Sequence, residues 1–208
     1  MANDRVDHHG PEFSDEQLAL RGHRFAPLQV EDMTPEQNAM VSAVMAGRRA
    51  SMQGPYNVLL RSPEMGIKAQ DFGEQVRFGS SLGLWLNELA ILLVARDWSC
   101  DFMWQAHRAI AIKAGLEEAV VDAIDKREEP PALKDDEAVV YRFCKELMTT
   151  RKVSDATFAI TKDAFGERGV VDLMGTLAYY QLVAMALNVD GYPVAEGLSA
   201  PAGPSLRA

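Results

Sequence analysis

The sequence predicts an all-α protein, a bundle of helices around one hydrophobic core. Apolar residues recur at intervals of three and four along most of the 208-residue chain. N-cap residues, prolines and glycines mark where these helices begin and end. Runs of alternating apolar and polar residues, which are typical of strands, are absent from the sequence.

Composition indicates an ordinary globular domain. Hydrophobic residues make up 48% of the chain and charged residues 25%. The formal net charge is −9 and no cluster of lysines and arginines stands out, so we expect no nucleic-acid partner. Two cysteines do not make a disulfide framework, and the first ten residues, MANDRVDHHG, lack the apolar segment of a secretory signal. We therefore expect a cytoplasmic protein.

We divide the chain into three parts. Residues 1–26 are polar and predict a loop-like N-terminal extension, and residues 27–189 carry the helical patterns of the main domain. Residues 190–208 are rich in glycine and proline and predict a tail that wraps the surface or a neighbouring subunit.

The first half of the main domain begins with a clear start signal. Thr34 is a predicted N-cap, Pro35 stands at the first helical position, and Gln37 completes a capping box. Gly47 ends this helix, and residues 54–66 form a connector too punctuated for a full helix. The next helix is marked by apolar residues at helical spacing, namely Met65, Ala69, Phe72 and Val76.

The second half contains the remaining predicted helices. Residues 84–96 and 99–114 form two apolar helices, and 116–126 a short amphipathic one. A further helix is marked by Ala138, Tyr141, Cys144, Leu147 and Met148. Ser154 caps another helix that runs to Gly166.

The segment 170–189 is long and apolar enough to suggest a membrane span. It contains Asp172, Gln181 and Asn188 and lacks basic flanks of the kind that orient a span. We therefore expect no membrane partner, and a helix buried on most sides at the centre of a bundle or at an oligomer interface.

One face of the predicted helix 99–114 gathers reactive side chains. Its members at helical spacing are Cys100, Met103, His107, Ile110 and Ala114, with Trp104 on the flank. Cys100 and His107 are two turns apart, about 10 Å along the axis, which is too far for a direct hydrogen bond. A water, a substrate or a carboxylate from elsewhere would have to join them. The alternative is that this face is plain core, with Met103 and Trp104 packing and Cys100 a small buried hydrophobe.

Glu88 is the candidate carboxylate. It lies in the apolar stretch LWLNELAILLVA, where an unpaired glutamate would cost several kcal/mol to bury. Such a residue either lies on a solvated edge or has a partner. Paired with a histidine, it could give and take a proton near neutral pH. No metal-ligand spacing and no phosphate-binding loop accompanies these residues, so we expect no metal.

From about Pro27 to Asn188 the chain resembles the carboxymuconolactone decarboxylase family, which belongs to the alkylhydroperoxidase D-like superfamily. The resemblance rests on GPYNVLLRSPEMG, then NELAILLVA, then WQAHRAIAIKAGL, and finally YYQLVAMALNV. It implies an alkylhydroperoxidase D-like helical bundle that assembles as a homo-oligomer, commonly a trimer or hexamer.

The peroxidase branch of that superfamily is similar in having Cys, Cys and His at 12, 15 and 19 residues after a glutamate. From Glu88 these offsets fall on Cys100, Met103 and His107, so methionine stands where the resolving cysteine would be. Thiol–disulfide cycling needs a second thiol. Asn87 also replaces the arginine that is usual before the glutamate.

The decarboxylase branch implies proton chemistry without metal or organic cofactor on a carboxylated lactone or related small acid. His107 would be the acid and Glu88 its partner, and Cys100 becomes optional. Met103, Trp104 and Arg96 would line the substrate pocket. An arginine would bind the acid, and the sequence does not rank the candidates Arg61, Arg77, Arg96 and Arg108.

Two alternatives stay open. The first is a thiol-dependent hydroperoxidase that uses Cys100, resolved by Cys144 or by an external thiol. The second is a non-catalytic oligomeric or ligand-binding protein that has kept only the fold.

Overall fold

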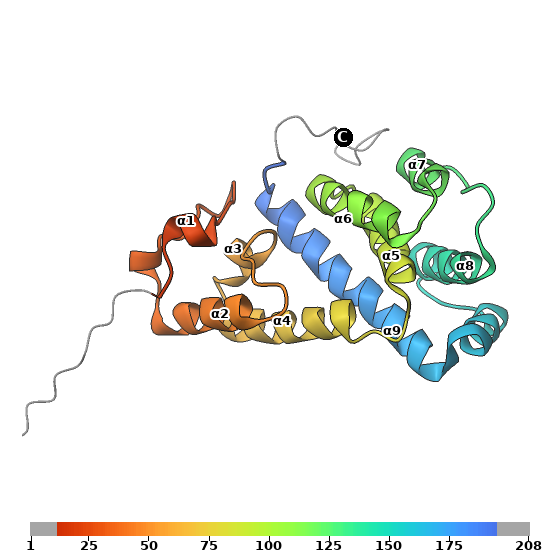
Figure 1. The fold of residues 1–208 in the computed structure, drawn as a ribbon, viewed down its shortest axis with the longest axis horizontal. Coiled ribbons are helices and arrows are strands. Elements are labelled where there is room, and N and C mark those ends of the chain that lie inside the picture. The colour runs from red at the N-terminus through yellow and green to blue at the C-terminus, as the bar shows by residue number, and fades with distance from the viewer. Residues whose placement is uncertain (1–11, 195–208) are drawn as a thin grey trace, which may run out of the picture.

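The computed structural model describes residues 12–194. In this part of the chain there are nine α-helices, one short 3₁₀ helix and no strands, which confirms the all-α prediction. The helices form two groups, and the long C-terminal helix α9 runs diagonally between them (Figure 1).

The N-terminal group is built on a small core of its own. It comprises α1 (Asp15–Leu18), the 3₁₀ helix (Val30–Asp32), α2 (Pro35–Ala46), α3 (Tyr56–Leu59) and α4 (Pro63–Phe78). The predicted capping box of Thr34 and Gln37 is present at the start of α2. The connector expected at 54–66 is more helical than predicted, since it contains α3 and the first turn of α4.

The C-terminal group is larger. It comprises α5 (Leu84–Asp97), α6 (Asp101–Ala114), α7 (Glu118–Lys126), α8 (Asp135–Thr150) and α9 (Asp155–Asp190). Helix α5 is buried over eleven of its fourteen residues because α6, α7, α8 and α9 all pack against it. This position explains why its sequence is apolar on every side.

Helix α9 belongs to both groups. Gly166 has a left-handed φ of 70° and interrupts the helix, as the sequence predicts, so that 167–190 forms a separate straight segment. Leu173 and Leu177 pack in the C-terminal core, whereas Leu182 packs against the N-terminal one. By length and composition α9 could cross a membrane; in the described chain it packs against both groups, and 44% of its most apolar window is buried.

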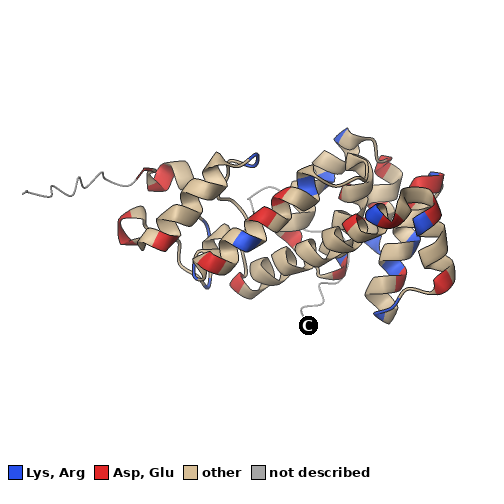
Figure 2. Cartoon of the chain, turned by 90° about the horizontal axis from the view of Figure 1, so that it is seen from below, with Lys and Arg blue, Asp and Glu red and all other residues tan. Residues whose placement is uncertain are grey.

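One side of α9 faces solvent, so within the single chain the helix is not buried on most sides; burial at an oligomer interface, the other form of the prediction, stays a prediction. The exposed apolar residues there are Val171, Met174, Met185 and Val189. Viewed from below, the straight part of α9 is free of charged residues between Asp172 and Asp190 (Figure 2).

Only two of the four residues predicted to form the buried apolar face of α4 are in fact buried. Ala69 and Val76 are buried, but Met65 and Phe72 are exposed. The buried side instead carries Gly73, where an added Cβ would lie 2.3 Å from the phenol of Tyr179. A glycine lets α4 approach α9 closely, so the contact is made by backbone and not by a large apolar side chain.

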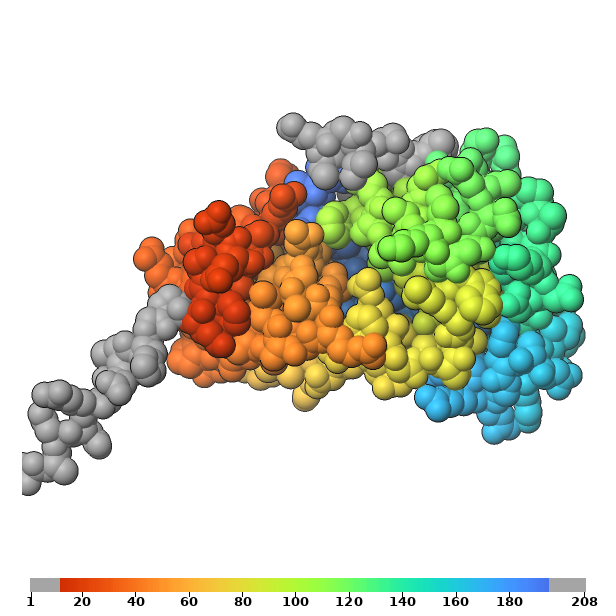
Figure 3. Space-filling model, viewed as in Figure 1, coloured from red at the N-terminus to blue at the C-terminus, as the bar shows by residue number. Residues whose placement is uncertain are grey.

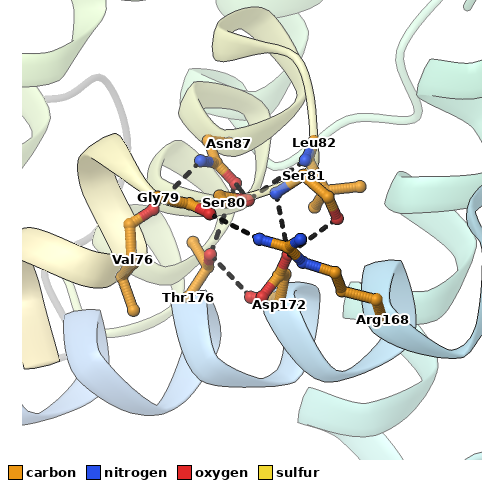
Figure 4. A network of polar contacts seen from close by, with 9 residues as sticks. All are labelled: Val76, Gly79, Ser80, Ser81, Leu82, Asn87, Arg168, Asp172 and Thr176. Atoms are coloured by element: carbon orange, nitrogen blue, oxygen red, sulfur yellow. Dashed lines mark hydrogen bonds and ion pairs between the residues drawn. The ribbon is translucent and has the colours of Figure 1, made fainter.

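Asn87 ties the turn before α5 to α9 (Figure 4). Its Nδ2 donates to the carbonyl of Val76, and its Oδ1 accepts from the hydroxyls of Ser80 and Thr176. The asparagine that replaces the expected arginine therefore has a structural role here. It fixes the first turn of α5, and Glu88 follows directly at the start of the second turn.

The same turn is held by a carboxylate. Asp172 on α9 accepts from both the backbone N–H and the hydroxyl of Ser81, at 2.7 and 2.6 Å. Arg168, one turn earlier on α9, donates to the carbonyl of Gly79 (Figure 4).

The ends of the described chain are packed on the domain. Within the extension that we expected to be loop-like, α1 forms one helical turn and Leu18 is buried. The carboxylate of Asp190 accepts from the backbone N–H groups of His23 and Phe25, which joins this segment to the end of α9. The predictions for residues 1–11 and for the tail at 195–208 fall outside the described residues.

Candidate active site

A buried histidine–carboxylate pair joins α5 and α6. His107 Nδ1 lies 2.7 Å from Glu88 Oε2, and the two residues are only 7% and 1% exposed. The pair forms because α5 and α6 are consecutive and pack side by side, so the apolar faces that the sequence predicts meet. Each side chain supplies the partner that burial of the other requires.

The pairing decides which histidine nitrogen can react. Glu88 accepts the hydrogen bond of Nδ1–H, which holds the ring in one orientation. The other nitrogen, Nε2, makes no hydrogen bond with residues 12–194 and is not sealed in the interior. Since His107 lines a cavity, Nε2 is the atom that a bound molecule would meet.

The cavity beside His107 has a volume of about 250 Å³. Its walls come from α6, from residues 49–55 and from the end of α4, and α9 supplies its floor. Figure 3 shows the molecule hollowed between the orange residues near position 50 and the green α6, with the blue α9 deep between them. A space of this size suits a small ligand.

Two arginines give the cavity a positive charge. Arg49 and Arg77 both line it, and neither forms an ion pair with a carboxylate in the part of the chain that the structure describes. Arg49 donates to the carbonyl of Gln53, and the guanidinium of Arg77 lies 5.6 Å from the ring centre of Phe78. The cavity is therefore suited to an anionic ligand.

Tyr180 lies next to His107 on the floor of the cavity. The two rings meet edge to face with their centres 5.1 Å apart. Burial raises the pKa of Tyr180, although the positive charges of Arg77 and Arg49 oppose this effect. The phenol therefore stays neutral and is a hydrogen-bond donor at physiological pH.

Cys100 lies outside the cavity. Helix α6 begins at Asp101, so Cys100 is its N-cap residue rather than part of the helical face that we predicted. The residue is 1% exposed and packs in the C-terminal core. Cys144 on α8 is also buried, and desolvation raises the pKa of its thiol well above the usual range.

The residues predicted to line the pocket divide between two places. Met103 lines the cavity, but Trp104 is buried in the core because it points about 100° further round α6. Arg96, which was also predicted to line the substrate pocket, does not line the cavity of His107. It lies two turns beyond Glu88, where its Nε donates to the carbonyl of Asp125, and lines a separate cavity of about 160 Å³ between α5, α7 and α8.

Only one of the four candidate arginines lines the cavity of His107. Arg77 does so, whereas Arg61 donates to backbone carbonyls near Asn57 and Arg108 pairs with carboxylates of α7. Sequence reasoning did not identify Arg49 or Tyr180. Tyr180 lies in the stretch YYQLVAMALNV that carried the family resemblance, but no pattern distinguished it from its neighbours.

The described residues contain no group of three or more His, Cys, Asp or Glu side chains that could hold a metal ion. In comparisons with known proteins, the sequence matches no protein-family model. No curated protein matches it either.

Proposed function

We propose that this protein is an enzyme of the carboxymuconolactone decarboxylase type, which transfers a proton to a carboxylated lactone or a related small acid. The observation that carries the proposal is the contact between His107 and Glu88 beside a cavity with two arginines that have no carboxylate partner in residues 12–194. An acid–base pair and an anion-binding wall are the two parts that such a reaction needs.

In the proposed reaction, Arg77 and Arg49 hold an acidic group of the substrate other than the one that leaves. Cleavage of the bond to the leaving carboxylate releases carbon dioxide and leaves the electron pair in a delocalised enolate. His107, as imidazolium, then donates the Nε2 proton to carbon and recovers a proton from solvent. Glu88 stabilises the imidazolium through Nδ1. The chain's own side chains thus supply each proton step.

The burial of Cys100 supports this function over a thiol peroxidase. A peroxide in the cavity would meet His107 and Met103, whereas Cys100 does not line it. A resolving role for Cys144 has no support, because burial keeps its thiol protonated. Two arginines without carboxylate partners would serve a ligand-binding protein equally well, so the feature that favours catalysis is the buried acid–base pair beside them.

The test compares two reactions of the wild-type protein. We expect it to release carbon dioxide from a carboxylated lactone and to leave tert-butyl hydroperoxide unconsumed in the presence of dithiothreitol. If the wild type consumes the hydroperoxide and Cys100→Ala does not, the thiol function is established instead. If the wild type consumes neither the lactone nor the hydroperoxide, the non-catalytic alternative is favoured.

We also propose that the protein forms a cytoplasmic homo-oligomer, a trimer or hexamer, through the exposed side of α9. We call this side the α9 stripe: Val171, Met174, Ala178, Met185 and Val189. The stripe extends over about 27 Å without a charged residue. A second copy of this chain is the occupant that fits, because an uncharged stripe is complementary to itself, and Ala178 at its middle lets two helices approach closely.

A further inference from the structure

The hydroxyl of Tyr180 has no role in the proton transfer described above. Tyr180 is 2% exposed and lines the cavity of His107. Its hydroxyl makes no hydrogen bond with the residues that the structure describes, yet it is not among the buried polar atoms sealed off without a partner. Tyr180 also lines a second cavity, but its volume of about 10 Å³ is too small for more than a water molecule. A ligand that accepts a hydrogen bond from this phenol would therefore lie in the cavity of His107.

The adjacent Tyr179 shows that this placement is specific. Tyr179 is also buried, at 3% exposed, and lies on the same helix. Its ring points to α4 instead, where it packs edge to face on Phe72 and its hydroxyl lies against Gly73. Tyr179 does not line the cavity of His107. Of these two neighbouring phenols, Tyr180 is the one that a molecule in the cavity of His107 can contact.

The surroundings of Tyr180 suit a donor to negative charge. The proposed reaction creates an enolate oxygen, and the group that stabilises it must donate a hydrogen bond without losing its own proton. Burial keeps the phenol neutral. Tyr180 and His107 line the same cavity with their ring centres 5.1 Å apart, so one small molecule bound there can contact both side chains.

We propose that Tyr180 is a second catalytic residue, whose hydroxyl donates a hydrogen bond to the substrate oxygen that becomes negative when carbon dioxide leaves. This rests on the proposed function. It further restricts the substrate class to acids in which a carbonyl oxygen is conjugated with the carbon that His107 protonates. When the carbon takes up its proton, the electron pair returns from the oxygen and the hydrogen bond weakens, which frees the product.

The first experiment compares Tyr180→Phe with Tyr179→Phe. Each variant removes one buried phenol oxygen from the same helix. Comparing their stabilities therefore separates a loss of activity from a loss of folding. We expect Tyr180→Phe to lower kcat by about 10²–10³-fold with little change in KM, because the hydrogen bond forms fully only in the transition state. Tyr179→Phe should keep most of the activity. Equal activity of the two variants would overturn the role of Tyr180.

The second experiment does not require turnover. The probe is 4-nitrophenol, whose visible absorbance reports its ionisation. Bound to the wild-type protein, it should ionise more readily than in water, and Tyr180→Phe should weaken binding of the phenolate by about tenfold or more, in line with a lost hydrogen bond to a charged group. Tyr179→Phe should bind as the wild type does. Equal ionisation in the wild type and Tyr180→Phe would contradict the proposal.

The two experiments separate the two proposals. If the wild type has no decarboxylase activity but the nitrophenol response depends on Tyr180, the proposed reaction fails and the oxyanion site stands. If decarboxylation depends on His107 but not on Tyr180, the function stands and this inference fails.

Discussion

At the scale of single residues, burial of Glu88 in α5 is the feature that needs a physical cause. A carboxylate taken out of water costs several kcal/mol unless a partner and hydrogen bonds compensate. His107 supplies both through a 2.7 Å contact. The pair is buried on one side and meets a cavity on the other, which distinguishes it from a purely structural ion pair.

Glu88→Gln tests the partner of the histidine. The amide keeps the shape of the side chain but removes the negative charge that stabilises imidazolium. We expect kcat to fall by about 10²-fold or more, within the range for acid–base groups. Steady-state kinetics measures the change, with Glu64→Gln on the exposed side of α4 as the control. A kcat equal to that of the control would contradict the role of Glu88.

Residue types and spacing predicted His107 and Glu88 but only part of what surrounds them. A histidine in an apolar helix, and a glutamate in the helix before it, can be recognised from the sequence alone. Arg49 and Tyr180 reach the cavity from segments far away in sequence, and nothing local marks them. Trp104 and Arg96 were misplaced because spacing along a helix does not say which neighbour each face meets.

At the scale of elements, caps and breakers predicted most boundaries. Ser154 caps α9, Gly115 ends α6 in a left-handed conformation, and Gly166 interrupts α9 as expected. The single-turn helices α1 and α3 were not predicted. Helices that short are unstable alone, and here they are held by the burial of Leu18 and Tyr56 in the N-terminal core.

Asn87→Ala tests the junction between α5 and α9. The change removes one donor and one acceptor and leaves the Val76 carbonyl and the Thr176 hydroxyl without this partner. We expect a loss of about 1–3 kcal/mol in the free energy of unfolding. Urea denaturation measures it, with Gln75→Ala on exposed α4 as the control. A loss no larger than the control's would show that the network does not hold the junction.

Asp97→Asn tests an unfavourable charge at the end of α5. Asp97 as a whole is exposed, but partial desolvation of its carboxylate raises its pKa, although Arg151 and Arg127 oppose this. The carboxylate also lies at the negative end of the helix dipole, and because the residue is exposed we expect a small effect. The folded state therefore prefers protonated Asp97. Its contribution to stability is present below the unfolded pKa near 3.8 and is lost as the pH rises through the higher folded pKa.

The amide should therefore raise the melting temperature at pH 7, and the gain should shrink as the pH falls toward 4. Thermal unfolding at several pH values measures this, with Asp71→Asn on the exposed side of α4 as the control. A gain that is independent of pH, or a loss at pH 7, would contradict the account.

At the scale of the whole molecule, α9 connects the two helical groups and serves two surfaces. Tyr180 and Leu187 face the cavity between the groups. The opposite α9 stripe faces solvent with apolar residues such as Val171 and Val189, both more than half exposed. Apolar periodicity predicted a helix here but could not separate the side that packs within the chain from the side left open.

The double change Met174→Glu with Met185→Glu tests the α9 stripe. Both methionines are about half exposed, so the monomer should fold, while paired stripes would bury like charges. We expect light scattering to give an oligomer for the wild type and a mass near 22.9 kDa for the double variant. Lys113→Glu on α6 makes the same change in net charge and should leave the oligomer intact. A wild-type monomer, or an oligomeric double variant, would contradict the proposal.

The most direct test of the central claim is decarboxylation of a carboxylated lactone in ²H₂O, followed by NMR. The wild type should place one deuteron on the carbon that loses carbon dioxide. His107→Gln should slow this step by about 10²–10⁴-fold, while Cys100→Ala keeps most of the rate. A His107→Gln protein as fast as the wild type, or a folded Cys100→Ala protein that has lost the reaction, would contradict the account.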